Sequence, residues 1–191
     1  MCFVKCLKKA KSFLLEPTKA FKKEQKTSFV EAFKYVLVIG PILAILNGVI
    51  AGLILPIISP LAGIITIIAV AIMSYVALII TPFISGLIVH LFAYLLGAKK
   101  GLEQTLKVTF YSQTPSMLFG WIPIIGSIFG IYGIVLQIIG IKNLQKMTMG
   151  RAILAVLLPI IILSVLLIIG ILLLIFTIFS LGIPFDANMF T

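Results

Sequence analysis

Long apolar runs make up most of the chain, and short polar or proline-containing breaks separate them. Apolar stretches of about 20 residues are long enough to cross a bilayer as helices. The expected fold class is therefore all-α, a polytopic membrane bundle of five transmembrane helices. Residues 1–28 precede the bundle, which occupies 29–180, and residues 181–191 form a short tail. The predicted spans are 29–55, 61–96, 102–121, 124–141 and 152–179.

The second apolar run is too long for one straight crossing. A helix over its 36 residues, 61–96, would extend about 54 Å, whereas the hydrocarbon layer is about 30 Å thick. Either one span kinks at Pro82, or two crossings divide near Thr81 and Pro82. We predict the single kinked span, because it returns Lys99 and Lys100 to the side of the basic N-terminus. The sequence leaves open whether part of this run is re-entrant.

Composition and charge support a membrane protein. Of the 191 residues, 62% are apolar and 10% are charged, against about half and a quarter in soluble domains; a water-soluble globular protein is therefore excluded. The formal charge is +10, and nine of the fifteen basic residues precede Tyr35. The remaining six lie in two breaks between apolar runs. This distribution predicts a cell-membrane protein with a cytoplasmic N-terminus and an extracytoplasmic C-terminus, and no nucleic-acid partner.

The segment before the first span has the pattern of an amphipathic helix. Its apolar residues recur at helical spacing, and most lysines lie away from that line. We expect an interfacial helix on the inner leaflet, where each lysine is worth about 1 kcal/mol near anionic lipid headgroups. A solvated basic tail is the alternative. The lysines expected to contact the membrane surface are Lys5, Lys8, Lys9, Lys11, Lys19, Lys22 and Lys23, and the apolar line is Phe3, Cys6, Leu7, Ala10, Phe13, Leu14, Pro17 and Phe21.

Polar side chains inside the predicted spans fall at similar depths. Counted from the inner boundaries, they lie roughly 8 to 15 Å from the cytoplasmic edge. We hypothesise a polar intramembrane cluster that opens toward the cytoplasm and binds a lipid headgroup or a small solute. The alternative is a set of interhelical hydrogen bonds that only hold the bundle together. The cluster comprises His90, Tyr111, Ser112, Gln113, Ser116 and Gln137.

The sequence offers little catalytic or metal-binding chemistry. His90 is the single histidine and Asp186 the single aspartate, and the predicted topology places them in opposite halves of the membrane. These residues cannot form a hydrolytic triad or a histidine-rich metal site, and no Walker or dinucleotide-binding pattern occurs. We therefore expect no enzymatic activity, no catalytic residue, no metal and no cofactor.

Several short motifs occur in a fixed order along the chain. They are Pro17-Thr18-Lys19-Ala20-Phe21, Gly97-Ala98-Lys99-Lys100-Gly101, Thr105-Leu106-Lys107-Val108, Tyr111-Ser112, Trp121-Ile122-Pro123, and Thr148-Met149-Gly150-Arg151-Ala152 with Pro159. In this order they resemble the Yip family of five-span membrane proteins, particularly its archaeal and bacterial branch. The resemblance spans residues 17–169 and implies a cytoplasmic N-terminus and a five-helix bundle. For eukaryotic relatives it also implies a role in membrane traffic through Rab-type small GTPases and partner Yip proteins. This chain lacks their Asp-Leu-Tyr-Gly-Pro signature, so small-GTPase binding is not expected.

These observations predict a non-enzymatic membrane protein that organises the membrane or partner proteins. Its contact surface would be the basic N-terminal helix and the inner loops, and its partners would be the lipid bilayer and other membrane proteins in a homo- or hetero-oligomer. The alternative is a small-solute or lipid transporter, or a channel-like component, that uses the polar intramembrane cluster.

Overall fold

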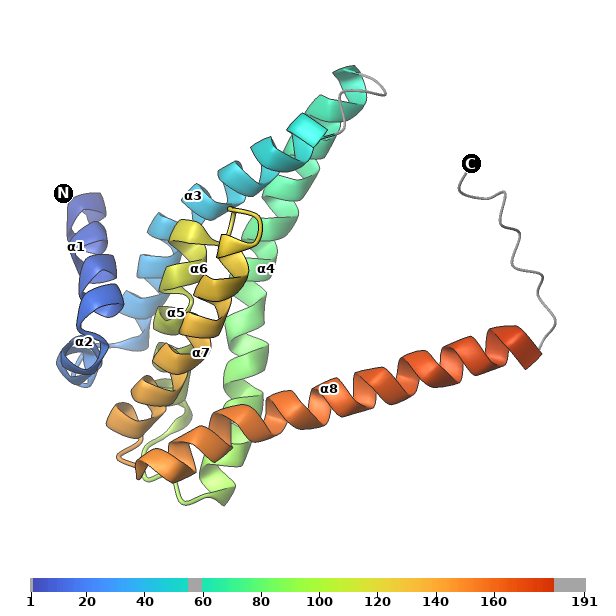
Figure 1. Ribbon diagram of the computed structural model, residues 1–191. Coiled ribbons are helices and arrows are strands. Elements are labelled where there is room, and N and C mark those ends of the chain that lie inside the picture. The colour runs from blue at the N-terminus through green and yellow to red at the C-terminus, as the bar shows by residue number, and fades with distance from the viewer. Residues whose placement is uncertain (1, 55–59, 181–191) are drawn as a thin grey trace.

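The computed structural model describes residues 2–54 and 60–180. Over these residues the chain forms eight α-helices and no strand, which confirms the all-α fold class. Most helices pack side by side in a bundle, and the last helix extends away from it (Figure 1). Residues 55–59, between the first two predicted spans, and the predicted tail, 181–191, lie outside the described residues.

Four helices match the first, second, fourth and fifth predicted spans, and each is long and apolar enough to cross a membrane. The second is one continuous helix of 36 residues that contains Pro82, so the helix does not divide there. The Pro82 carbonyl accepts a hydrogen bond from the Thr109 hydroxyl at 3.0 Å. The four helices are α3 (Phe29–Ile54), α4 (Pro60–Leu95), α7 (Ile125–Leu144) and α8 (Met149–Ser180).

Helices α3 and α4 form an antiparallel hairpin that extends beyond the shorter helices of the bundle (Figure 1). Glycines on α3 allow this close approach. A Cβ atom added at Gly48 or Gly52 would collide with Ile67 of α4. Small residues commonly bring membrane helices together in this way.

The prediction of a single helix over 102–121 is wrong. Pro115 interrupts it because proline has no N–H to donate to the carbonyl of Tyr111, four residues earlier. The Thr114 hydroxyl donates to that carbonyl instead, at 2.6 Å. The chain forms two shorter helices here, α5 (Leu102–Ser112) and α6 (Thr114–Phe119).

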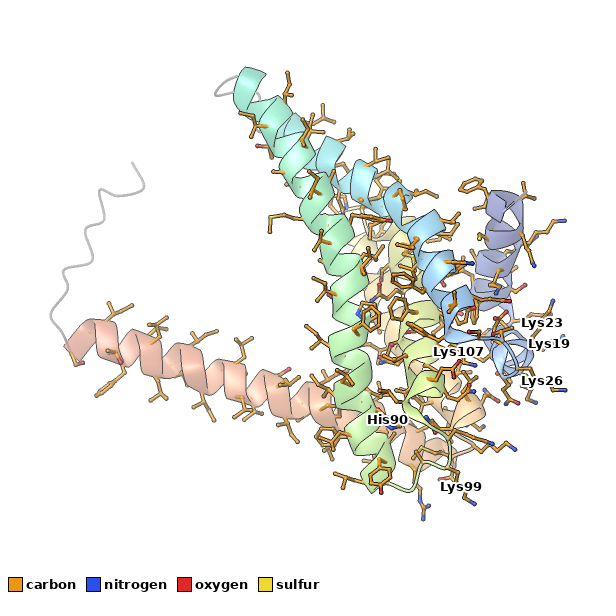
Figure 2. The ribbon with its side chains drawn as sticks, turned by 180° about the vertical axis from the view of Figure 1, so that it is seen from behind. Lys19, Lys23, Lys26, His90, Lys99 and Lys107 are labelled. Atoms are coloured by element: carbon orange, nitrogen blue, oxygen red, sulfur yellow. The ribbon has the colours of Figure 1, made fainter. Side chains whose placement is uncertain are left out.

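The starts of α3 and α5 meet the ends of α4 and α7 at one end of the bundle. The Phe29 N–H donates to Glu103 Oε1 at 2.9 Å, and the Lys100 N–H donates to Gln145 Oε1 at 2.9 Å. Because α5 begins here and α7 ends here, α5 and α6 together cross the bundle in the direction opposite to α7. Figure 2 shows Lys19, Lys23, Lys26 and Lys99 at this end. We call it the polar end, and it comprises residues 24–29, 97–107 and 143–148.

The N-terminal segment consists of two helices that pack against the bundle. Much of the predicted apolar line is buried against other helices of the protein. The Phe13 ring stacks on Tyr111 of α5 with centroids 4.6 Å apart, while Phe3 and Leu7 remain exposed. The helices are α1 (Cys2–Leu15) and α2 (Pro17–Glu24), and their buried apolar residues are Cys6, Ala10, Phe13, Ala20 and Phe21.

Helix α8 has two different parts. Its first three turns pack against α4 and α7, and Ala152, Ala155, Val156 and Pro159 are buried there. From residue 160 to residue 180 nearly every side chain is exposed, although almost all are apolar. This distal part of α8, residues 160–180, points away from the bundle (Figure 1).

Candidate functional site

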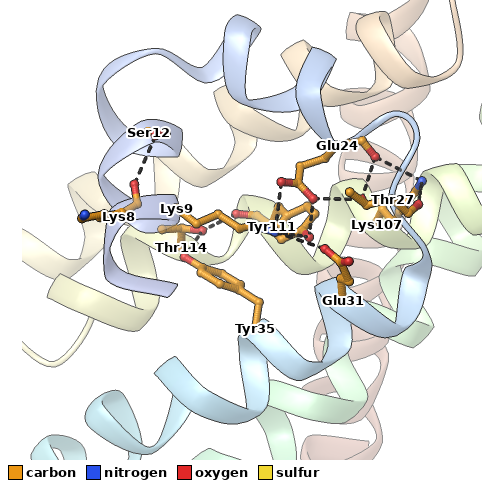
Figure 3. Close-up of polar contacts among 10 residues, drawn as sticks. All are labelled: Lys8, Lys9, Ser12, Glu24, Thr27, Glu31, Tyr35, Lys107, Tyr111 and Thr114. Atoms are coloured by element: carbon orange, nitrogen blue, oxygen red, sulfur yellow. Dashed lines mark hydrogen bonds and ion pairs between the residues drawn. The ribbon is translucent and has the colours of Figure 1, made fainter. Parts of the chain in front are cut away.

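A buried carboxylate joins the N-terminal segment to the bundle. Glu24, the last residue of α2, is only 4% exposed. Its carboxylate forms an ion pair with Lys9 of α1 at 2.9 Å. It also accepts hydrogen bonds from the Tyr111 hydroxyl at 2.8 Å and the Thr27 hydroxyl at 2.9 Å. Figure 3 shows these groups converging from α1, α2, the following loop and α5.

These contacts determine the charge state of Glu24. Burial by itself raises the pKa of the carboxyl group, because the charged form loses hydration. The hydrogen bonds from Lys9, Tyr111 and Thr27, together with the Lys9 charge, outweigh burial and hold the pKa below its ordinary value of 4.5. Glu24 is therefore ionised at neutral pH, and its carboxylate is bonded to groups within the protein.

A buried lysine caps the same turn from the other side. Lys107 of α5 is fully buried. Its ammonium group donates to the carbonyl oxygens of Thr27 at 2.7 Å, Glu24 at 3.3 Å and Gln25 at 3.4 Å. A cation suits the carbonyl-rich end of a helix, so Lys107 stabilises the end of α2. The buried polar cluster thus comprises Lys9, Glu24, Thr27, Lys107 and Tyr111.

Aromatic rings surround this cluster. The rings of Phe13 and Phe21 meet edge to face with centroids 4.9 Å apart. Tyr35 of α3 lies 5.4 Å from Tyr111, measured between ring centroids, and its hydroxyl lies 3.0 Å from that of Thr114. The rings limit the access of water to Glu24, which strengthens the ion pair but makes the loss of either partner costly.

The structure distributes the predicted polar intramembrane cluster over three places. Tyr111 belongs to the buried polar cluster. His90 of α4 lies elsewhere, with Nδ1 2.9 Å from the Thr105 hydroxyl, which also accepts a hydrogen bond from Gln145 at 2.8 Å. The other four residues line one small cavity of about 150 Å³ between α5, α6 and α7; they are Ser112, Gln113, Ser116 and Gln137.

The lysines predicted to contact the membrane surface fall into two groups. Lys9 is half-buried and bonded to Glu24 and Tyr111, so it faces the protein. The other six are exposed on the N-terminal segment, and they are Lys5, Lys8, Lys11, Lys19, Lys22 and Lys23.

Sequence reasoning overlooked the structural roles of Glu24 and Lys107. A signal for Glu24 was present, because the residue lies three and four positions after Phe21 and Ala20, on the apolar face of α2. An acid on an apolar face needs a buried partner. Lys107 had a weaker signal: it follows Glu103 and precedes Tyr111 by one helical turn each, within a predicted span.

An all-helical chain with four membrane-length apolar helices and a charged polar end defines a multi-pass membrane protein. The family model of the Yip1 domain matches residues 11–172, so the chain belongs to the Yip1 family. This finding confirms the resemblance seen in the sequence motifs. The matched region includes all of the buried polar cluster except Lys9. No curated protein and no solved structure matches the chain.

Proposed function

We propose that this Yip1-family chain is a non-enzymatic membrane protein that organises partner membrane proteins in a homo- or hetero-oligomer. The observation that carries the proposal is the docking of the N-terminal segment through the buried Glu24–Lys9 pair. This docking gives the exposed lysines of α1 and α2 a fixed position relative to the bundle. Held in this way, they form a defined contact surface rather than a flexible basic tail.

The proposed orientation follows from the grouping of basic segments. The N-terminal segment, the loop before α5 and the loop after α7 meet at the polar end, where Lys26, Lys100 and Lys146 line one cavity. By the positive-inside rule this end faces the cytoplasm. We propose five crossings, with α5 and α6 together as the third, so that the C-terminus is extracytoplasmic. A reporter fused after Thr191 should therefore be active only outside the cell membrane.

Site-specific photocrosslinking in native membranes tests the organising role. Crosslinkers placed at Lys11 and Lys22 should capture the same membrane protein, or a second copy of this chain. The same positions in a Glu24→Ala variant should lose that capture, because the segment is no longer fixed. Equal capture with and without Glu24 would contradict a contact surface that depends on docking.

One observation favours the alternative, a transporter or channel-like component. Gln113 lines the small cavity between α5, α6 and α7. Its Oε1 atom is buried and has no hydrogen-bond partner among the described residues. A solute could supply that partner. The cavity of about 150 Å³ is, however, smaller than ligand pockets, which are about 300 Å³ or more. Gln113→Leu and His90→Ala, alone and combined, should leave solute and lipid flux unchanged; a loss of flux with intact folding would favour the transporter.

A further inference from the structure

Two adjoining cavities lie where α1, α2 and the start of α3 meet. The larger has a volume of about 500 Å³ and the smaller about 260 Å³, and both are lined by Lys5, Lys9 and Glu31. Lys8, Lys23 and Glu24 line the larger cavity, and Lys34 lines the smaller one. We call the two together the basic cavity.

The basic cavity has a positive charge that the protein does not neutralise. Five lysines line it against two glutamates. Glu24 is already paired with Lys9, and Glu31 reaches only Lys9, at 3.8 Å. Within the described ranges, no carboxylate pairs with the remaining four lysines, which are Lys5, Lys8, Lys23 and Lys34.

Helix geometry brings these like charges together. Lys5, Lys8 and Lys9 occupy one face of α1, because residues three and four apart are neighbours on a helix. Lys23 approaches from α2 and Lys34 from α3. Converging ammonium groups repel one another unless an anion lies between them. The arrangement therefore favours a bound anion that bridges the three helices.

The lysines that line the basic cavity and the position of the cavity indicate which anion fits. Lysine ammonium groups bind phosphate as point charges and hydrogen-bond donors. The cavity is lined by Glu31, in the first turn of the candidate span α3, which places it at the level of lipid headgroups. Val4 and Leu7 of α1 and Val30 of α3 are also exposed and can contact acyl chains.

We propose that the basic cavity binds a phosphate group, carried by an anionic phospholipid headgroup or by a soluble phosphate. The bound phosphate fastens the N-terminal segment to α3 in addition to the buried polar cluster. This inference rests on the proposed function in one respect, namely that α3 spans a membrane. It does not require a partner protein.

The test compares two triple variants of the full chain in phosphatidylcholine nanodiscs, with and without phosphatidylglycerol. Lys5→Gln/Lys8→Gln/Lys23→Gln changes the basic cavity. The matched control, Lys11→Gln/Lys19→Gln/Lys22→Gln, removes the same charge from exposed sites on the same helices. Native mass spectrometry counts retained phosphatidylglycerol, and thermal unfolding measures its effect on stability. A parallel arm adds pyrophosphate to the chain in phosphatidylcholine alone.

For a lipid site, phosphatidylglycerol should bind and stabilise the unaltered chain, and the cavity variant should lose at least about tenfold in affinity, far more than the control. For a soluble ligand, pyrophosphate should stabilise the unaltered chain and the control but not the cavity variant. Equal loss in both triple variants would overturn the proposal, because it would indicate diffuse attraction to the membrane. Absence of any stabilisation of the unaltered chain by either anion would also overturn it.

These outcomes separate the phosphate site from the organising role. Partner capture is read at Lys11 and Lys22, which lie outside the basic cavity, and it needs no anionic lipid. If the chain binds phosphate but captures no partner, the proposed organising function is contradicted and the phosphate site is not. A chain that captures its partner but binds neither anion fails only the phosphate site.

Discussion

The polar end and the distal part of α8 differ in what their side chains contact. At the polar end, buried charges such as Glu24 and Lys107 each have several partners from different helices. Along the distal part of α8, apolar side chains such as Leu172, 60% exposed, extend from a single helix. The difference teaches that directional polar contacts fix the docking of the N-terminal segment, whereas lipid or another protein must cover distal α8.

Removing the buried carboxylate should have the largest effect. Glu24→Ala leaves half-buried Lys9 with only the more distant Glu31 carboxylate, at 3.8 Å, and leaves the Tyr111 hydroxyl without an acceptor. The free energy of unfolding should fall by about 3 kcal/mol, because breaking a buried pair leaves an uncompensated charge. Unfolding by sodium dodecyl sulfate in mixed micelles, followed by circular dichroism, measures this loss.

A matched control lies on the same segment. Glu16 pairs with Lys19 at 3.1 Å, but both side chains are largely exposed. Glu16→Ala should change stability by less than about 1 kcal/mol. If Glu16→Ala lowered the free energy of unfolding as much as Glu24→Ala does, burial would not distinguish the two ion pairs. The contrast drawn between buried and exposed contacts would then be wrong.

The next largest effect should come from the buried lysine. Lys107→Met keeps most of the side-chain volume but removes the donor from the Thr27 carbonyl, while the Glu24 and Gln25 carbonyls keep donors from Thr27 and Gln104. The expected loss is about 1–3 kcal/mol, the cost of unsatisfied buried polar groups. Lys100→Met is the control, because the Lys100 side chain is exposed and its backbone makes the contact with Gln145. Proteolysis of the loop after α2 should be faster only in Lys107→Met.

Much of the fold was predictable because apolar length is a local property of the sequence. The ranges of α3, α4, α7 and α8 follow from runs that only a bilayer or a core can accommodate. The break at Pro115 also has a local cause, but it ends a helix only because Thr114 satisfies the freed carbonyl. Counting apolar residues misses that exchange of donors.

The candidate site was much less predictable, because its contacts join distant parts of the chain. Tyr111 is 87 residues from Glu24, and Lys9 is 102 residues from Tyr111. Shared depth suggested that Tyr111 and Gln137 belong together, but depth does not fix which way a helix faces. The direction in which a helix face points decides which residues it contacts. Here α1 and α2 direct toward the bundle side chains that a helix on the membrane surface would direct toward lipid.

Acid should weaken the polar end selectively, with an effect smaller than that of the truncations. The pKa of Glu24 is lowered in the folded chain, so the ion pair contributes its full stability above the ordinary value of 4.5 and loses it as pH falls through the folded value. Unfolding measured between neutral pH and about pH 3 should show this loss. In Glu24→Gln that part of the pH dependence should disappear. An unchanged acid profile would mean that other carboxylates dominate.

The smallest effect should come from distal α8. Leu172→Ala removes a side chain that contacts no bundle helix, so stability in detergent should change by less than about 0.5 kcal/mol. Leu136→Ala, at a fully buried side chain of α7, should cost about 2–5 kcal/mol, because it opens a cavity. Because both substitutions delete the same atoms, a difference between their effects on stability reports the difference in burial. If Leu172→Ala costs as much as Leu136→Ala, and the cost of Leu172→Ala depends on protein concentration, distal α8 packs against a second copy of the chain rather than against lipid.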